Sequence, residues 1–183
     1  MSMRIITSAF RIAPEAAVST GSVERLYGRV FGPARFRKAS HRYRTGLAPL
    51  AELSWIARTD DAIVGAIRYW SILVGGERAR ALLLGPLAVA PDCEDRGIGR
   101  ALVLKTLDLA AAAGHDLVLL VGDPEYYDRF GFVPATPYGF VMPGESRPER
   151  LQVLSLQGRP LERAGGVLRR VSAQPAARQS RAS

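Results

Sequence analysis

The sequence has little of what several protein classes need. Its 183 residues include one cysteine, Cys93, and two histidines, His41 and His115. A single cysteine excludes an internal disulfide framework and favours a reducing compartment. So few histidines and cysteines do not form a metal-binding pattern, so we expect no metal. A run of about 20 apolar residues, the length needed to cross a bilayer, is also lacking, and we expect no membrane partner.

Residues 1–6, Met-Ser-Met-Arg-Ile-Ile, show neither the apolar core nor the cleavage site of a signal peptide, so we expect a cytoplasmic protein. Hydrophobic residues make up 48% and charged residues 23% of the chain, as in globular proteins. The length fits one domain, which we predict over residues 1–172. Residues 173–183 are rich in Ala, Arg, Gln and Ser, and we expect a disordered basic tail there.

Acidic residues are scarce, with 17 against 25 basic residues and a net charge of +8. The imbalance is strong in residues 1–50, where Glu15 and Glu24 are the only acids. A basic surface attracts polyanions and phosphorylated cofactors alike. Because only Lys38 and Lys105 among the basic residues are lysines, part of the excess reflects arginine-rich composition. We do not expect nucleic acid as the partner.

The apolar pattern predicts alternating strands and helices with an α+β fold. An early run of antiparallel strands precedes a strand–helix–strand crossover and a closing strand. Gly85-Pro86 falls inside one strand, and because proline cannot donate to a ladder, a bulge or an exposed edge is required there. The predicted strands are 4–9, 53–58, 62–74, 79–90, 117–121 and 151–156, and the predicted helices are 14–30, 34–45, 98–113 and 124–130.

The turn Arg96-Gly97-Ile98-Gly99-Arg100 follows a predicted strand and opens directly into a predicted helix. The first N–H groups of a helix have no intrahelical partner, and the helix dipole adds partial positive charge. Two glycines allow a ligand to approach the backbone closely. The sequence therefore predicts an anion site here, suited above all to a phosphate.

The same region resembles the acetyl-CoA motif of the GNAT superfamily of N-acetyltransferases. Leu87-Ala88-Val89 is followed by Glu94-x-x-Gly97-x-Gly99, and beyond the next strand Tyr127-x-x-x-Gly131-Phe132 is similar to the closing segment of small bacterial members. The resemblance covers roughly residues 50–135. It implies a mostly antiparallel central sheet, flanked by helices, with one pair of strands splayed apart.

The resemblance also implies acetyl-CoA as co-substrate and a set of residues that bind it. The pyrophosphate would be held by main-chain amides around Asp95–Arg100, with added charge from Arg96 and Arg100. The pantetheine would pair with the backbone in the splayed region, and the N–H of Val89 would polarise the acyl carbonyl. The cofactor-binding residues are thus predicted to be Leu87, Ala88, Val89, Asp95, Arg96, Gly97, Ile98, Gly99 and Arg100.

Tyr127 matches the position of the family's general acid, which protonates the departing CoA thiolate, with its neighbour Tyr126 as the alternative. No general base is assigned: Glu52, Glu77 and Asp123 are candidates, and a relay through water is equally compatible. His41, in a basic predicted helix, is expected to be solvated. Tyr69 and Trp70 are interpreted as core or cleft-wall residues.

The predicted function is transfer of an acetyl group to a primary amine of a small molecule or peptide, by direct attack in a ternary complex. Glu94 stands where the family has Gln or Arg, and a carboxylate beside a pyrophosphate is unfavourable. Glu94 and the unassigned base motivate an alternative, a CoA-binding sensor or scaffold without turnover. The arginine-rich segment motivates another, an RNA-directed acylating protein. The acceptor, the acyl group and the existence of a homodimer stay open.

Overall fold

The computed structural model describes residues 10–60, 62–76 and 80–172. Within them, eight strands form one sheet in the order β1-β2-β3-β4-β5-β7-β6, with β8 beside β3. All neighbouring pairs are antiparallel except β4 and β5, which are parallel. This confirms the predicted α+β class and mostly antiparallel sheet. The strands are β1 Arg11–Pro14, β2 Trp55–Arg58, β3 Ile63–Val74, β4 Arg80–Val89, β5 Leu117–Val121, β6 Val133–Pro134, β7 Leu151–Ser155 and β8 Leu168–Arg170.

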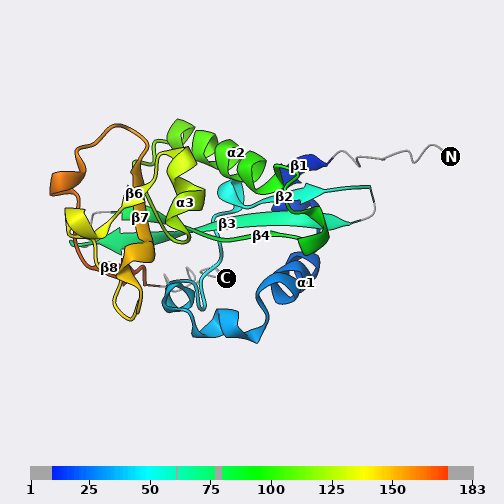
Figure 1. The fold of residues 1–183 in the computed structure, drawn as a ribbon, viewed down its shortest axis with the longest axis horizontal. Coiled ribbons are helices and arrows are strands. Elements are labelled where there is room, and N and C mark those ends of the chain that lie inside the picture. Colours follow the sequence, from blue (N-terminus) through cyan, green and yellow to red (C-terminus); the bar gives the residue numbers. More distant parts are fainter. Residues whose placement is uncertain (1–9, 61, 77–79, 173–183) are drawn as a thin grey trace, which may run out of the picture.

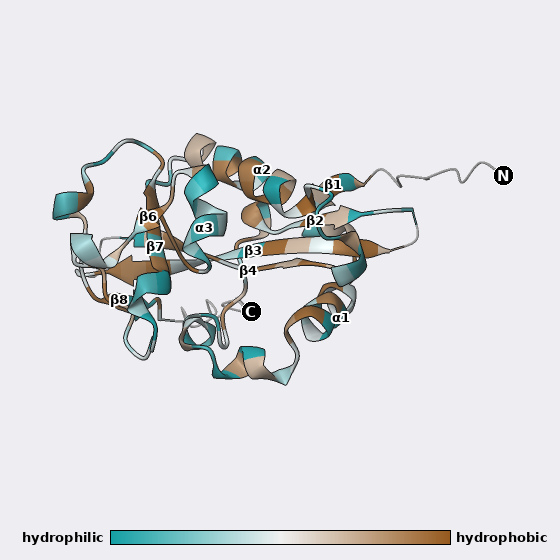
Figure 2. Cartoon of the chain, in the orientation of Figure 1, coloured by the Kyte–Doolittle hydropathy of each residue, from teal (hydrophilic) through white to brown (hydrophobic). Residues whose placement is uncertain are grey.

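The long central strands β3 and β4 lie between two helices: α2 (Ile98–Ala112) covers one face and α1 (Thr20–Phe31) the other (Figure 1). A third, short helix is α3 (Pro124–Tyr127). The apolar residues of the sheet concentrate on β3, β4 and β7 (Figure 2). The 3₁₀ turns are η1 Glu15–Ala17, η2 Pro33–Arg37, η3 Ala39–Tyr43, η4 Ala51–Leu53, η5 Pro91–Cys93, η6 Asp128–Phe130, η7 Thr136–Tyr138, η8 Pro148–Arg150 and η9 Leu161–Arg163.

The predicted bulge at Gly85-Pro86 is confirmed by the register between β3 and β4. Leu87 lies opposite Ile67 and Leu84 lies opposite Tyr69, so Gly85 and Pro86 together face the single residue Arg68. Such a two-against-one arrangement bends the strand locally. The bend directs the second half of β4 away from its other neighbour, β5.

The splayed strand pair is also present. Within the described residues, β4 and β5 pair only where Leu82 meets Val118 and Leu83 meets Leu119. After Leu83, β4 continues through the bulge as residues 84–89 without pairing to β5, although β3 still pairs with its other edge. Backbone groups on the free edge of β4 therefore face an opening in the middle of the sheet.

One predicted helix begins too early, and another is wrong. The predicted helix 14–30 contains the end of β1, where Pro14 pairs with Trp55, and α1 begins only at Thr20. The predicted basic helix 34–45 is instead two 3₁₀ turns separated at Lys38, whose backbone is extended. A continuous helix there would place cations such as Arg35, Lys38 and Arg42 three or four residues apart, which is destabilising.

Strands β1 and β8 were not predicted, because each is short and carries no regular alternation. The predicted strand 4–9 and the predicted tail 173–183 lie outside the described residues. Helix α2 and strands β3, β4, β5 and β7 lie within one or two residues of their predicted bounds. Their uniform apolar or periodic patterns explain this agreement.

Candidate active site

The turn before α2 has the geometry of an anion site. Asp95 and Gly97 both have left-handed backbones, with φ of 60° and 75°. The first α-helical hydrogen bond runs from the N–H of Ala101 to the carbonyl of Gly97, at 2.9 Å. The N–H groups of Ile98, Gly99 and Arg100 come before that bond, in the first turn where no intrahelical acceptor exists. The predicted pyrophosphate residues therefore lie together at the positive end of a 15-residue helix.

The side chains in this turn differ in their surroundings. Ile98 is buried against Gly65 of β3, so only its backbone faces outward. Asp95, Arg96 and Arg100 are exposed, and so is Glu94. Arg96 donates to the carbonyl of Asp92 at 3.3 Å. The turn thus offers main-chain N–H groups and two arginines to an anion, with Glu94 at its border.

Strand β4 presents alternate backbone groups to the opening. The N–H of Ala90 donates to the carbonyl of Val64, at 2.8 Å, so Ala90 points its N–H toward β3. Because direction alternates along an antiparallel strand, the backbone of Ala88 also pairs with β3, and the groups of Leu87 and Val89 face the opening. These are the groups that an amide-bearing pantetheine arm needs as partners.

The two candidate tyrosines have different neighbours. A Cβ added to Gly99 would come within 2.5 Å of the Tyr126 hydroxyl, so Tyr126 packs on the start of α2. A Cβ on Gly122 would come within 2.3 Å of the Tyr127 ring, which therefore covers the end of β5. Burial, and to a smaller degree Tyr126, raises the pKa of Tyr127 above its ordinary value of 10.0. Its phenol stays protonated around neutral pH and can donate a proton.

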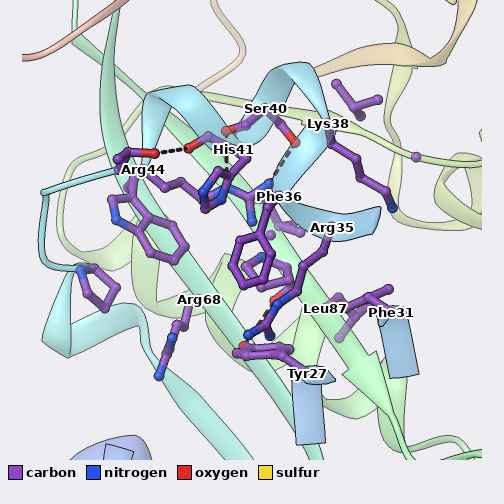
Figure 3. A pocket seen from close by; sticks show the side chains of 18 of the residues that line it. Tyr27, Phe31, Arg35, Phe36, Lys38, Ser40, His41, Arg44, Arg68 and Leu87 are labelled. Atoms are coloured by element: carbon purple, nitrogen blue, oxygen red, sulfur yellow. Dashed lines mark hydrogen bonds between the residues drawn. The ribbon is translucent and has the colours of Figure 1, made fainter. Parts of the chain in front are cut away.

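A cavity of about 560 Å³ lies at the opening, on the α1 face of the sheet. Its inner end is formed by residues 84–87 of β4, residues 121–123 and Tyr127. Figure 3 shows His41 and Phe36 on one side of it and Tyr27 on the other. Its remaining lining residues are Glu24, Phe31, Arg35, Lys38, Ser40, Arg44, Thr45, Gly46, Leu47, Pro49, Arg68, Trp70 and Arg150.

Strand β3 supplies this cavity with two side chains. Successive side chains of a strand point to opposite faces, and Arg68 and Trp70 share the cavity face. Trp70 donates through its indole N–H to the carbonyl of Leu47, at 3.1 Å. Tyr69 lies on the other face, where its hydroxyl is 2.8 Å from that of Thr106 on α2. Of the two aromatic residues left open by the sequence, Trp70 is cleft wall and Tyr69 is core.

Arg68 is buried and joins the cavity wall to α1 and η1. Its Nε lies 2.8 Å from Glu15 Oε2, and its Nη1 lies 2.6 Å from Glu24 Oε1. The same guanidinium lies over the Tyr27 ring, and Arg35 binds the other oxygen of Glu24 at 3.0 Å. Tyr27 in turn donates to the carbonyl of Pro86, at 3.2 Å. This chain of contacts fixes α1 to the bulge of β4.

Several residues at the cavity were not predicted as functional, among them Arg44, Arg150 and Lys38. His41 was expected to be solvated, but it is half-buried and lines the cavity. Burial, followed by Arg44 and Arg35, lowers its pKa from the ordinary 6.5, so the imidazole is neutral at pH 7. Of the three predicted base candidates, Asp123 lines the cavity, Glu52 lies in η4, and Glu77 is outside the described residues.

The described residues contain neither a metal-binding cluster nor a membrane-spanning helix. No cluster of three or more His, Cys, Asp or Glu side chains is arranged to hold a metal ion. None of the helices in this part of the chain combines the length and apolarity required to cross a membrane.

Comparison with known proteins identifies the class. Residues 51–134 match the family model for the acetyltransferase (GNAT) domain. The matched residues are similar to the GNAT superfamily of N-acetyltransferases, a group of acyltransferase enzymes, which agrees with the prediction from the motif residues.

The individual relatives share less than a third of their aligned residues with this chain. The protein named uncharacterized N-acetyltransferase YhbS, from Escherichia coli strain K12, is 29% identical over 122 residues, which cover 66% of this chain and 72% of the relative. The crystal structure of E. coli YhbS in complex with CoA aligns with a TM-score of 0.70 and 25% identity, covering 87% of each chain. A Brucella melitensis GNAT acetyltransferase solved with acetyl-CoA shares the fold, with a TM-score of 0.67, 23% identity and coverage of 90% and 97%.

Proposed function

We propose that the protein transfers an acetyl group from acetyl-CoA to a primary amine of a small molecule or peptide, in a ternary complex. The observation that carries this proposal is that Tyr127 and the free edge of β4 line one continuous cavity. The solved relatives that bind CoA or acetyl-CoA support the choice of co-substrate.

The binding residues fit acetyl-CoA in order along the cleft. The N–H groups of the first turn of α2 would hold the pyrophosphate, with Arg96 and Arg100 adding charge. Leu87 and Val89 would pair with the pantetheine. The N–H of Val89 would donate to the acyl carbonyl oxygen, where negative charge develops during attack.

In the transfer step, the amine nitrogen forms a bond to the acyl carbon, and the bond between that carbon and sulfur breaks. The Tyr127 phenol gives its proton to the departing thiolate. We call the part of the cavity lined by α1, residues 33–49, β3 and Arg150 its acceptor part, and His41 lies there. The amine loses one proton, and we infer that neutral His41 accepts it, directly or through water. The net products are the N-acetylated amine and CoA. The proton accepted by His41 then passes through solvent to the Tyr127 phenolate, which restores both residues.

The test is a panel of amines assayed for release of free CoA thiol from acetyl-CoA, together with the shift in melting temperature that acetyl-CoA causes. Turnover with any amine, combined with a melting shift, supports the proposal. A melting shift without turnover across the panel would favour the sensor or scaffold. Acylation of RNA in preference to free amines would favour the RNA-directed alternative.

A further inference from the structure

The cations around the acceptor part of the cavity fall into two groups. Arg35 and Arg68 are matched by Glu24 and Glu15. Within the described part of the chain, the contacts of Arg44 and Arg150 are with neutral oxygens. Arg44 donates to the carbonyl and hydroxyl of Ser40, at 3.1 and 2.6 Å, and Arg150 donates to the carbonyl of Gly122, at 3.2 Å.

The positive charges of Arg44 and Arg150 also repel the ammonium of Lys38. Burial and then the nearby Arg150 and Arg44 lower the pKa of Lys38, and Glu145 opposes them only in part. Burial lowers the pKa of Arg44 to about 10. Glu24 and Asp123 also line the cavity, but neither forms an ion pair with Arg44 or Arg150 among the described residues, so the neutral oxygens only partly replace the hydration that these guanidinium groups lose. An anion bound in the cavity would replace it.

The position of these cations relates them to the transferred group. Arg150 contacts Gly122, the residue covered by the Tyr127 ring, so it lies beside the proposed general acid. Arg44 lies over the Trp70 ring, 5.5 Å from its centre, on the wall that faces the acceptor. The same cavity also has apolar lining side chains, among them Phe36 and Leu87.

We propose that the acceptor is an amine that also carries a carboxylate beside an apolar body, and that Arg44 and Arg150, aided by Lys38, bind this anionic group. The inference rests on the proposed function, whose acceptor it specifies. A guanidinium can hold a carboxylate through two parallel hydrogen bonds, which gives orientation as well as affinity. Purely cationic polyamines are repelled by the same residues.

Binding can be measured apart from transfer by using ligands without an amine. The CoA-saturated protein is titrated calorimetrically at low salt with 3-phenylpropanoate and with its neutral amide, 3-phenylpropanamide. We expect the carboxylate to bind at least 10-fold more tightly. In Arg44→Gln and Arg150→Gln, the ratio of the amide dissociation constant to the carboxylate dissociation constant should fall at least fivefold. Arg58→Gln, which removes the same charge from exposed β2 outside this cavity, should leave it unchanged.

Equal binding of the two ligands to the wild type overturns the inference. An unchanged ratio of the amide and carboxylate dissociation constants in both arginine variants also overturns it, provided that the melting temperatures show folded protein. Tighter binding of 2-phenylethyl phosphate than of the carboxylate keeps the anion site but overturns the choice of carboxylate. A carboxylate preference without CoA release from any amine leaves this site standing and defeats the proposed function. Transfer to amines with no preference for phenylalanine over 2-phenylethylamine supports the proposed function and defeats the carboxylate site.

Discussion

The proposed cofactor side and the proposed acceptor side of the cleft are built in different ways. The cofactor side is contiguous: β4, the turn and α2 supply its residues from one stretch, 87–100. The acceptor side draws on three regions that are far apart in the sequence: the consecutive elements α1, η2 and η3, then strand β3, and finally Arg150. The first depends on backbone groups, which any sequence with the right turn can present. The second depends on side chains, which set what is bound.

The largest effect should come from breaking the acceptor side at Arg68. In Arg68→Met the Glu15 carboxylate stays buried without its partner, and removal of one partner from a buried pair costs about 3–5 kcal/mol of unfolding free energy. Denaturant unfolding measures this. The double variant Arg68→Met with Glu15→Gln should recover part of the loss. Equal stability of the single variant and the wild type would show that the ion pair contributes nothing.

Tyr127→Phe tests the point where the two sides meet. Loss of a general acid lowers kcat by about 100-fold or more, while the KM for acetyl-CoA should change little, because the ring is kept. Tyr126→Phe, which alters the adjacent ring, is the matched control and should retain most activity. The pKa of Tyr127 is raised, so wild-type activity should not be lost through its deprotonation below about pH 10. An unchanged kcat in Tyr127→Phe would remove this residue from the mechanism.

Gly97→Ala perturbs the cofactor side alone. Gly97 has a φ of 75°, and an L-residue in that conformation costs about 1–2 kcal/mol. A Cβ at this position meets no atom within 4 Å, so the cost is one of backbone conformation and not of packing. We expect acetyl-CoA to bind severalfold more weakly, with a larger dissociation constant measured calorimetrically. The preference for the carboxylate ligand over its neutral amide should stay unchanged. A loss of acceptor preference in this variant would show that the two sides are coupled.

Glu94→Gln should have the smallest effect, in the opposite direction. Glu94 is exposed beside the anion turn, and exposed charge interactions contribute about 0–1 kcal/mol. Removal of the negative charge should tighten acetyl-CoA binding by up to about fivefold, with a larger gain at low salt. Weaker binding in Glu94→Gln would mean that the carboxylate supports the turn instead of opposing the ligand.

The same contrast explains what could be predicted from the sequence. The turn before α2 and the bulge at Gly85-Pro86 are local: glycine, proline and apolar periodicity determine them within a few residues. Arg44 and Arg150 line the same cavity although more than 100 residues separate them, and no local pattern indicates that they do. The segment 34–45 looked helical by composition, but its cations are better separated by two short turns that bring Lys38 and Arg44 to the cavity.

Arg68 is a charged residue inside the apolar strand 63–74, and charged residues are seldom buried without partners. The two acids in the first 50 residues, Glu15 and Glu24, are those partners. A lone arginine in a buried strand, together with scarce upstream carboxylates, therefore predicts a long-range ion pair.

The residues between α1 and β2 that form the acceptor wall, 33–49, are attached to the sheet by the buried side chain of Tyr43 and by hydrogen bonds at the segment and at the adjacent Leu50. The Trp70 indole holds Leu47, the N–H of Leu50 binds the carbonyl of Tyr69, and the Tyr43 hydroxyl binds the carbonyl of Leu168. The sheet edge that receives the acyl donor lies outside this segment. Replacement of residues 33–49 by the matching segment of a relative is therefore a route to chimeric enzymes that keep one donor and exchange acceptors.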